Sequence, residues 1–182
     1  MLISKETSDA LDLLYGQFFD LNATLDVVAS TLQNDFSMPK AADIVHHKIS
    51  HLMPLLADKI SEIKDNYNIR SIRPSVHEDR REYSDLYVMF QTVLDEFEST
   101  YKMIVAVQEV SIKSGDKNVL NDLQRFMCVF NKVMGQIYTL RDKAEQLPRD
   151  FDTYDAHIDR WGIVGVDLEL SLIHISEPTR PY

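Results

Sequence analysis

The fold is decided by the stretch from Ser84 to Leu147, SDLYVMFQTVLDEFESTYKMIVAVQEVSIKSGDKNVLNDLQRFMCVFNKVMGQIYTLRDKAEQL. Its apolar residues recur at steps of three and four, which places them on one side of a helix. The pattern predicts two long helices, interrupted only at Lys113-Ser114-Gly115-Asp116. Gly115 suits the left-handed conformation that ends a helix, and Asp116 can accept hydrogen bonds from the free N–H groups of the next helix. We therefore expect an antiparallel helical pair.

Each helix of this pair is expected to turn one broad apolar stripe inward. The predicted inward positions are Leu86, Phe90, Val93, Leu94, Phe97, Tyr101, Ile104, Val105 and Ile112, then Val119, Leu120, Leu123, Phe126, Met127, Phe130, Val133, Met134, Ile137, Leu140, Ala144 and Leu147. A single hairpin cannot cover both stripes, so the rest of the chain has to supply more helices.

Two more long helices are predicted before the pair. The first runs from Ser4 to Gln33, with Thr7 or Ser8 as its cap, and the second runs from Pro39 to Tyr67. A proline at the first turn favours helix initiation, whereas Pro54 inside the second helix removes one backbone hydrogen bond. We expect a kink near Ser50 to Met53; two shorter helices are the alternative.

The remaining segments are predicted to connect or cover the four helices. The polar stretch from Asn66 to Tyr83 is the expected crossover, and its charged run from His77 to Glu82 is expected to be solvated surface. After Pro148, residues 151–167 suit a short fifth helix capped by Thr153. The aspartates there lack the glycine and the terminal glutamate of a calcium loop, which favours a surface role.

Composition excludes several classes of protein. A chain of 182 residues with 45% hydrophobic residues predicts one folded domain. Its formal net charge of −10 argues against nucleic-acid binding. The single cysteine, Cys128, excludes an internal disulfide and a cysteine-based metal site. With no membrane-spanning run and no signal peptide, a cytoplasmic protein is expected. No phosphate loop or nucleophile motif is present, so no small-molecule substrate can be named.

Residues 170–182, LSLIHISEPTRPY, resemble a translated sequencing adapter of the kind found at the ends of metagenome-derived reading frames. We expect the natural protein to continue past about Glu169. The expected organisation is a bundle domain over residues 1–147, a C-terminal helix or tail over 148–169, and an artefactual tail.

The second half of the chain resembles the ferritin-like superfamily. The stretches Phe90–Glu98, Gly115-Asp116 and Leu120–Phe126 are similar to the third helix, the turn and the fourth helix of bacterial ferritins, and the resemblance covers roughly Leu11 to Leu147. It implies an all-α, ferritin-like four-helix bundle with a long crossover between helices 2 and 3. It also implies a bacterial homo-oligomer concerned with iron.

The di-iron centre of that superfamily needs a Glu on two helices and a Glu-x-x-His motif on the other two. In the second helix, this chain has His51 at the position of the Glu and Pro54 at the position of the His. In the fourth helix, it has Cys128, Asn131 and Gln136 where the superfamily has glutamates. The partial matches are Asp20 in the first helix and Asp95 or Glu96 in the third. A standard di-iron centre is therefore not expected.

Mini-ferritins of the Dps type bind iron between two subunits, and the second helix offers a related set. It carries Asp43-x-x-His46 with His47, and the spacing of Asp43, His47, His51 and Asp58 places these four along one side of the helix. Asp20 or Asp26 of a partner subunit is a possible further ligand. The alternative is a polar helix edge without metal.

Two functions remain open. The first is an iron-binding or iron-storage protein of the ferritin-like, Dps-like type with a degenerate or non-standard site, and ferroxidase activity is left undecided. Its candidate metal ligands are Asp20, Asp43, His47, His51, Asp95 and Glu98. The second is a helical interaction protein that has lost the di-iron centre.

Overall fold

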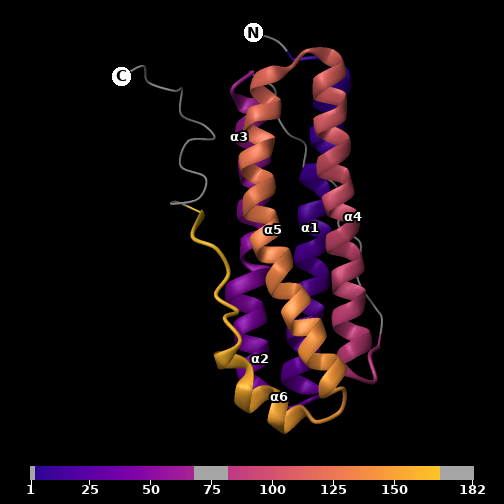
Figure 1. Cartoon of the computed structure of the whole chain (residues 1–182), viewed down its shortest axis with the longest axis vertical. Helices are drawn as coiled ribbons and strands as arrows, with labels where there is room; N and C mark the ends of the chain where they lie inside the picture. The colour runs from indigo at the N-terminus through magenta and orange to yellow at the C-terminus, as the bar shows by residue number, and fades with distance from the viewer. Residues whose placement is uncertain (1–2, 68–81, 169–182) are drawn as a thin grey trace.

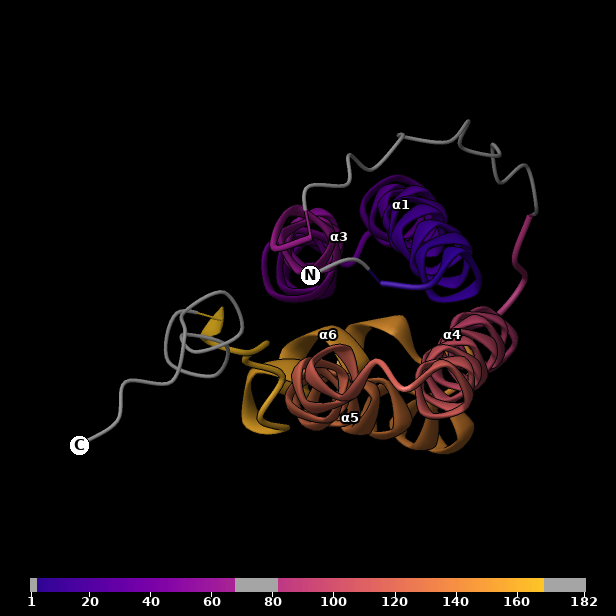
Figure 2. The ribbon, with the colours of Figure 1, turned by 90° about the horizontal axis from the view of Figure 1, so that it is seen from above.

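Four long helices form a bundle of two layers (Figure 1 and Figure 2). The computed structural model describes residues 3–67 and 82–168, and this part of the chain contains helices but no strands. α1 packs against α3 and α4, and α4 packs against α5. Seen along the bundle axis in Figure 2, α1 and α3 make one layer and α4 and α5 the other. The predicted all-α four-helix bundle is confirmed.

The helices begin and end close to the predicted positions. Their bounds are α1 Lys5–Asn34, α2 Pro39–Ile44, the π-helical turn Val45–Ser50, α3 Leu52–Asp65, α4 Leu86–Ser114, α5 Lys117–Gln146, α6 Phe151–His157 and a 3-10 turn Ile158–Arg160. The predicted crossover lies largely outside the described residues, as does the tail at 170–182. None of the described helices combines the length and the hydropathy that crossing a membrane requires.

The predicted apolar stripes form the core. Phe90, Phe97, Phe126 and Phe130 are almost completely buried. Phe18 of α1 meets the last two edge-on, with ring centroids 5.5 and 6.1 Å apart, a favoured geometry for aromatic pairs. Burial of side chains this large supplies much of the driving force for folding.

Among the predicted core positions Ile112 is wrong, because its side chain is 63% exposed, and Val105 and Leu120 are only half-buried and do not belong to the core. Val107 and Ser111 continue the inward line of α4 instead, and both are buried. Ile112 is rotated by about 100° from its neighbour Ser111, away from α1 and α5. Ser111 satisfies its hydroxyl inside the core by donating to the carbonyl of Val107 at 2.8 Å.

The turn between α4 and α5 follows the prediction only in part. Gly115 has φ 75° and ends α4, as expected. Asp116 does not cap α5; its Oδ2 atom accepts from the hydroxyls of Ser4 at 3.1 Å and Thr7 at 2.6 Å. Ser4, rather than Thr7 or Ser8, caps α1 by accepting from the backbone N–H of Thr7. The fold brings the start of α1 beside this turn, where Asp116 joins the two.

In place of the kink predicted near Ser50 to Met53, the structure has a π-helical turn that begins earlier, at Val45. The helix of residues 39–65 passes through the π-helical turn Val45–Ser50 before α3 begins at Leu52. Pro54 has no N–H to donate to the carbonyl of Ser50, four residues earlier. The side-chain amide of Asn22 on α1 donates to that carbonyl instead, at 3.1 Å. A contact from another helix therefore satisfies the backbone group that the proline leaves unbonded.

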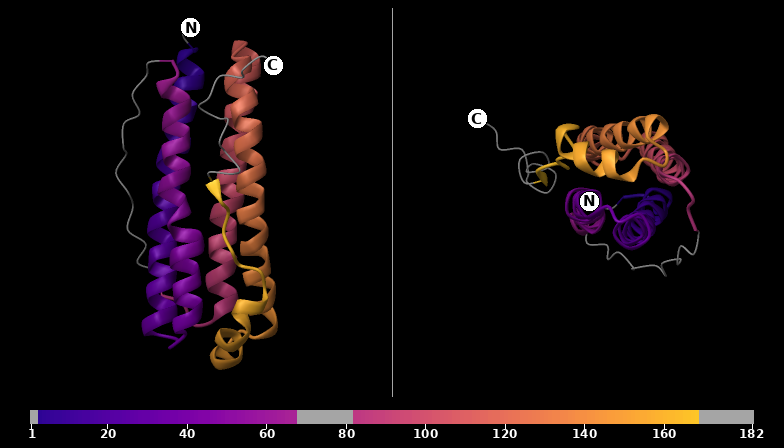
Figure 3. Two further views of the ribbon diagram at one scale, coloured as in Figure 1. Left: turned by 90° about the vertical axis from the view of Figure 1, so that its left-hand side faces the viewer. Right: turned by 90° about the horizontal axis from the view of Figure 1, so that it is seen from below.

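The region after α5 is less helical than predicted. α6 ends at His157, and its cap is Asp150, which accepts from the N–H of Thr153. Residues 161–168, here called the C-terminal segment, then run along the seam between the two layers (Figure 1 and Figure 3). A continuous helix is disfavoured here because Gly162 and Gly165 both have positive φ, 71° and 68°.

Candidate functional site

The interior of the bundle does not fit a di-iron centre. Among the described residues, no carboxylate or imidazole is buried; the buried polar side chains are Thr7, Thr24, Thr31, Ser50, Lys64, Thr100 and Ser111. The only charged side chain of that set, Lys64, forms an ion pair with Asp12 of α1. Apolar side chains fill the centre, so the ligands that such a centre requires are missing from the described chain.

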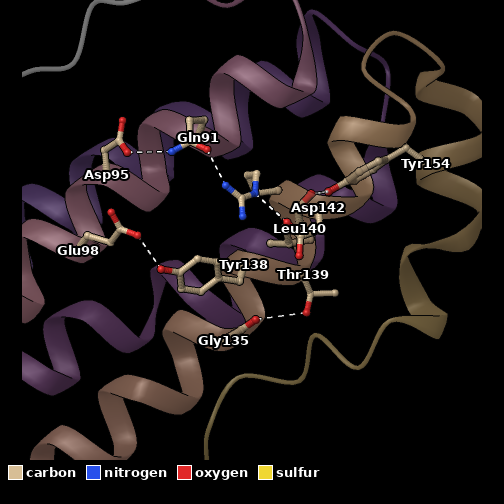
Figure 4. A network of polar contacts seen from close by, with 10 residues as sticks. Gln91, Asp95, Glu98, Gly135, Tyr138, Thr139, Leu140, Asp142 and Tyr154 are labelled. Carbon is tan, nitrogen blue, oxygen red and sulfur yellow. Dashed lines mark hydrogen bonds and ion pairs between the residues drawn. The ribbon is translucent and has the colours of Figure 1, made fainter.

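Two candidate ligands, Asp95 and Glu98, lie on α4 and take part in polar contacts near α5 (Figure 4). Asp95 accepts from the amide of Gln91 at 2.9 Å, and Gln91 accepts from Arg141 at 2.8 Å. Glu98 accepts from the hydroxyl of Tyr138 at 2.6 Å, and this hydrogen bond raises the pKa of Tyr138. Both carboxylates therefore belong to polar contacts between α4 and α5, and neither joins the other candidates.

Asp20 is not among the side chains that converge with the histidines. It is half-buried on α1, six residues before Asp26, which corresponds to about 9 Å along the helix axis.

Three imidazoles converge on the other layer of the bundle. One nitrogen from each of His46, His47 and His51 lies within 4.8 Å of the other two. The ring centroids are 4.3 Å apart for His46 and His51, 4.8 Å for His46 and His47, and 5.2 Å for His47 and His51. In the described part of the chain this is the one group of three or more His, Cys, Asp or Glu side chains that comes so close.

The π-helical turn produces this convergence. Residues 46 and 51 of a regular α-helix would point in directions about 140° apart, because each residue turns the helix by about 100°. Here the N–H of His51 donates to the carbonyl of His46 at 3.1 Å, an i to i+5 bond that brings the two residues to the same side of the helix. The widened turn therefore adds His46 to the predicted pair of His47 and His51.

Two carboxylates lie beside the imidazoles. Asp43 lies 3.2 Å from Nε2 of His47, and Asp26 of α1 lies 3.6 Å from Nδ1 of His46. Asp26 is held by the buried hydroxyl of Ser50, which donates to it at 2.6 Å. At 3.2 Å the carboxylate of Asp43 is close enough to accept from Nε2 of His47, which would leave Nδ1 free for a metal, a common arrangement at metal sites.

The cluster is accessible from solvent. His47 and His51 are exposed and His46 is half-buried. A hollow of about 370 Å³ between α1 and α2 reaches His46 and is lined by Asp26, Ala29, Ser30, Gln33, Pro39, Ala42 and Asp43. An ion from solvent can therefore reach the imidazoles without passing through the core.

The sequence indicated part of this histidine cluster. The spacing of Asp43, His47 and His51 predicted that they share one side of a helix, and the structure brings them together. The spacing could not predict His46, because the i to i+5 turn departs from α-helical periodicity. Asp26 was considered only as a ligand from a partner subunit, whereas it contacts His46 within the same chain.

No protein-family model and no curated protein matches the chain. A similar solved structure is an open pore ferritin from the hyperthermophilic archaeon Archaeoglobus fulgidus, with a TM-score of 0.75 and 15% identity. The similarity covers 97% of this chain and 98% of the archaeal chain. At this identity the comparison bears on the fold, and it agrees with the two-layer helical arrangement described above. The chain therefore has the ferritin-like fold.

Proposed function

We propose that this chain is a ferritin-like, Dps-like protein that binds iron at a non-standard site on the surface of the bundle. The ligands are the imidazoles of His46, His47 and His51, with the carboxylate of Asp43 beside them. The observation that carries the proposal is the approach of three imidazole nitrogens to within 4.8 Å of one another. Such separations require little movement to meet the distance of about 2 Å at which histidine binds a metal.

The chemistry of the donor groups supports a transition metal. Imidazole binds iron, zinc, copper and nickel, whereas magnesium and calcium prefer oxygen ligands. Asp26 and Asp43 lie beside the histidines and partly balance the charge of a divalent cation. The fold that the chain shares with a ferritin makes iron the first ion to test.

Anaerobic titration with Fe²⁺, followed by ultraviolet absorbance and equilibrium dialysis, tests the proposal. The His47→Ala/His51→Ala variant should lose most of the binding, because one imidazole would remain. His157→Ala is the matched control, since His157 is an exposed histidine on α6. Identical binding by the wild-type protein and the double variant would refute the site.

Assembly into a cytoplasmic homo-oligomer is part of the proposal. Exposed leucines on α1 and α3, Leu13 at 69% and Leu55 at 48%, are apolar surface that a second copy would cover. Light scattering that shows a monomer at micromolar concentration would contradict this assembly.

A second candidate function is a helical interaction protein without metal chemistry. The observation that favours it is the absence of a buried carboxylate or imidazole from the described part of the bundle. In that case the exposed apolar side chains bind another chain, and the histidines are only hydrated by solvent. The protein would then form an oligomer, and Fe²⁺ or Zn²⁺ at tenfold excess would leave its melting temperature unchanged.

A further inference from the structure

The C-terminal segment contacts the turn that carries the histidines. Gly165 is buried at the seam, and a Cβ atom at this position would lie 2.4 Å from the carbonyl oxygen of Lys48. Lys48 directly follows His47 within the π-helical turn. The contact is backbone against backbone, so neither side can relieve a clash by changing a rotamer. Any larger residue at position 165 must displace the turn or the segment.

Gln136 of α5 holds Gly165 in this position. Its amide nitrogen donates to the carbonyl of Gly165 at 2.8 Å, and its amide oxygen accepts from the N–H of Gly165 at 2.8 Å. Paired bonds of this kind fix both the position and the direction of the segment. Ile163 and Leu168, on either side, are buried and add apolar contact. The segment is therefore fixed to α5 on one side and contacts the π-helical turn on the other.

The shape of that turn determines whether the three imidazoles meet. The rings of His46 and His51 meet edge-on because an i to i+5 hydrogen bond joins their backbones, and Lys48 lies between them in sequence. A displacement at Lys48 changes the turn at its middle. Metal sites are sensitive to such changes, and loss of an outer contact that orients a ligand typically weakens binding 10- to 100-fold.

We infer that Gly165 and Gln136 are positioning residues for the metal site: they hold the π-helical turn in the shape that brings His46, His47 and His51 together. The inference rests on the proposed function for its effect on affinity. Its geometric part concerns the metal-free protein and can be tested separately.

Two glycine substitutions provide a matched comparison. Gly165→Ala and Gly162→Ala place alanine at nearly the same positive φ, so both carry a similar backbone strain. Only the first meets a neighbour, because a Cβ atom at Gly162 has nothing within 4 Å. Gln136→Ala removes the paired hydrogen bonds without adding bulk. Circular dichroism verifies that every variant remains helical.

The first measurement is binding of Co²⁺, whose visible spectrum reports the number and geometry of its ligands. We expect Gly165→Ala and Gln136→Ala to weaken binding by about tenfold or more and to change the spectrum. Gly162→Ala should leave both unchanged. Equal affinities for the two glycine variants would overturn the inference.

The second measurement is the NMR chemical shifts of the histidine rings without metal. Gly165→Ala should move the resonances of His46, His47 and His51, and Gly162→Ala should leave them in place. If the wild-type protein binds no Co²⁺ but the rings respond in this way, the proposed function fails and the positioning role stands. If Co²⁺ binds but neither the rings nor the affinity respond, the positioning role fails and the metal site stands.

Discussion

Replacing Asn22 with alanine should destabilise the bundle through a backbone group on a different helix. The amide of Asn22 donates to the carbonyl of Ser50 at 3.1 Å and to its hydroxyl at 2.9 Å. That carbonyl lacks its usual helical partner because the residue four positions later is Pro54. Ser50 is fully buried, so its carbonyl is shielded from bulk water when the donor is lost.

The magnitude follows from the buried carbonyl. A buried acceptor left without a donor costs about 1–3 kcal/mol, whereas the Ser50 hydroxyl keeps its bond to Asp26 and adds little. We expect the free energy of unfolding to fall by about 2 kcal/mol. For a chain of this size that corresponds to a fall of roughly 4–8 °C in melting temperature.

Urea denaturation of a double-mutant cycle isolates this interaction. Pro54→Ala restores an N–H opposite the Ser50 carbonyl, so Asn22→Ala should cost less in that background. We expect a coupling of about 1 kcal/mol or more between the two sites, within the range seen for residues that share a partner. The m-value should stay constant, since the surface exposed on unfolding is nearly unchanged. Strictly additive effects would show that the Ser50 carbonyl does not link Asn22 to Pro54.

Three further predictions concern other parts of the molecule. Asp116→Ala removes the acceptor that the hydroxyls of Ser4 and Thr7 share. Urea denaturation should show that the free energy of unfolding falls by about 1–2 kcal/mol, and hydrogen exchange at the start of α1 should become faster. Asp122→Asn should make stability less dependent on pH. Asp122 is half-buried, and the partial loss of hydration raises the pKa of its carboxyl from 3.8 to about 6. The folded state therefore binds the proton more tightly than the unfolded state, and stability falls as pH rises from about 4 to 6. Above pH 6 the asparagine variant should therefore be more stable than the wild type, by about 1 kcal/mol after allowance for partial exposure. At pH 4 the two proteins should differ little in stability. A gain in stability that is larger at pH 4 than at pH 7 would contradict the predicted direction of the pH effect. Zn²⁺ should displace Fe²⁺ from the histidine site in competition dialysis, since imidazole sites bind zinc more tightly than ferrous iron, and Mg²⁺ should not compete.

Local chemistry made the helices and the core predictable. The spacing of Phe90, Phe97, Phe126 and Phe130 follows from the 3.6-residue period of the helix, and all four are buried. Gly115 ends α4 because glycine adopts positive φ without steric cost, a property of one residue. Such features depend on neighbours close in sequence, so the sequence alone indicates them.

The tertiary structure decided the caps and the candidate site. Asp116 bonds to Ser4 and Thr7, which precede it by more than 100 residues, instead of capping its own helix. The π-helical turn that brings His46 to His51 ends at Ser50, and the Ser50 carbonyl accepts from Asn22, which lies 28 residues earlier in the sequence. Periodicity describes a regular helix and therefore misses a turn whose hydrogen bonds are completed by another helix. The sequence determined which residues could bind a metal, and the packing of α1 against the π-helical turn decided which of them meet.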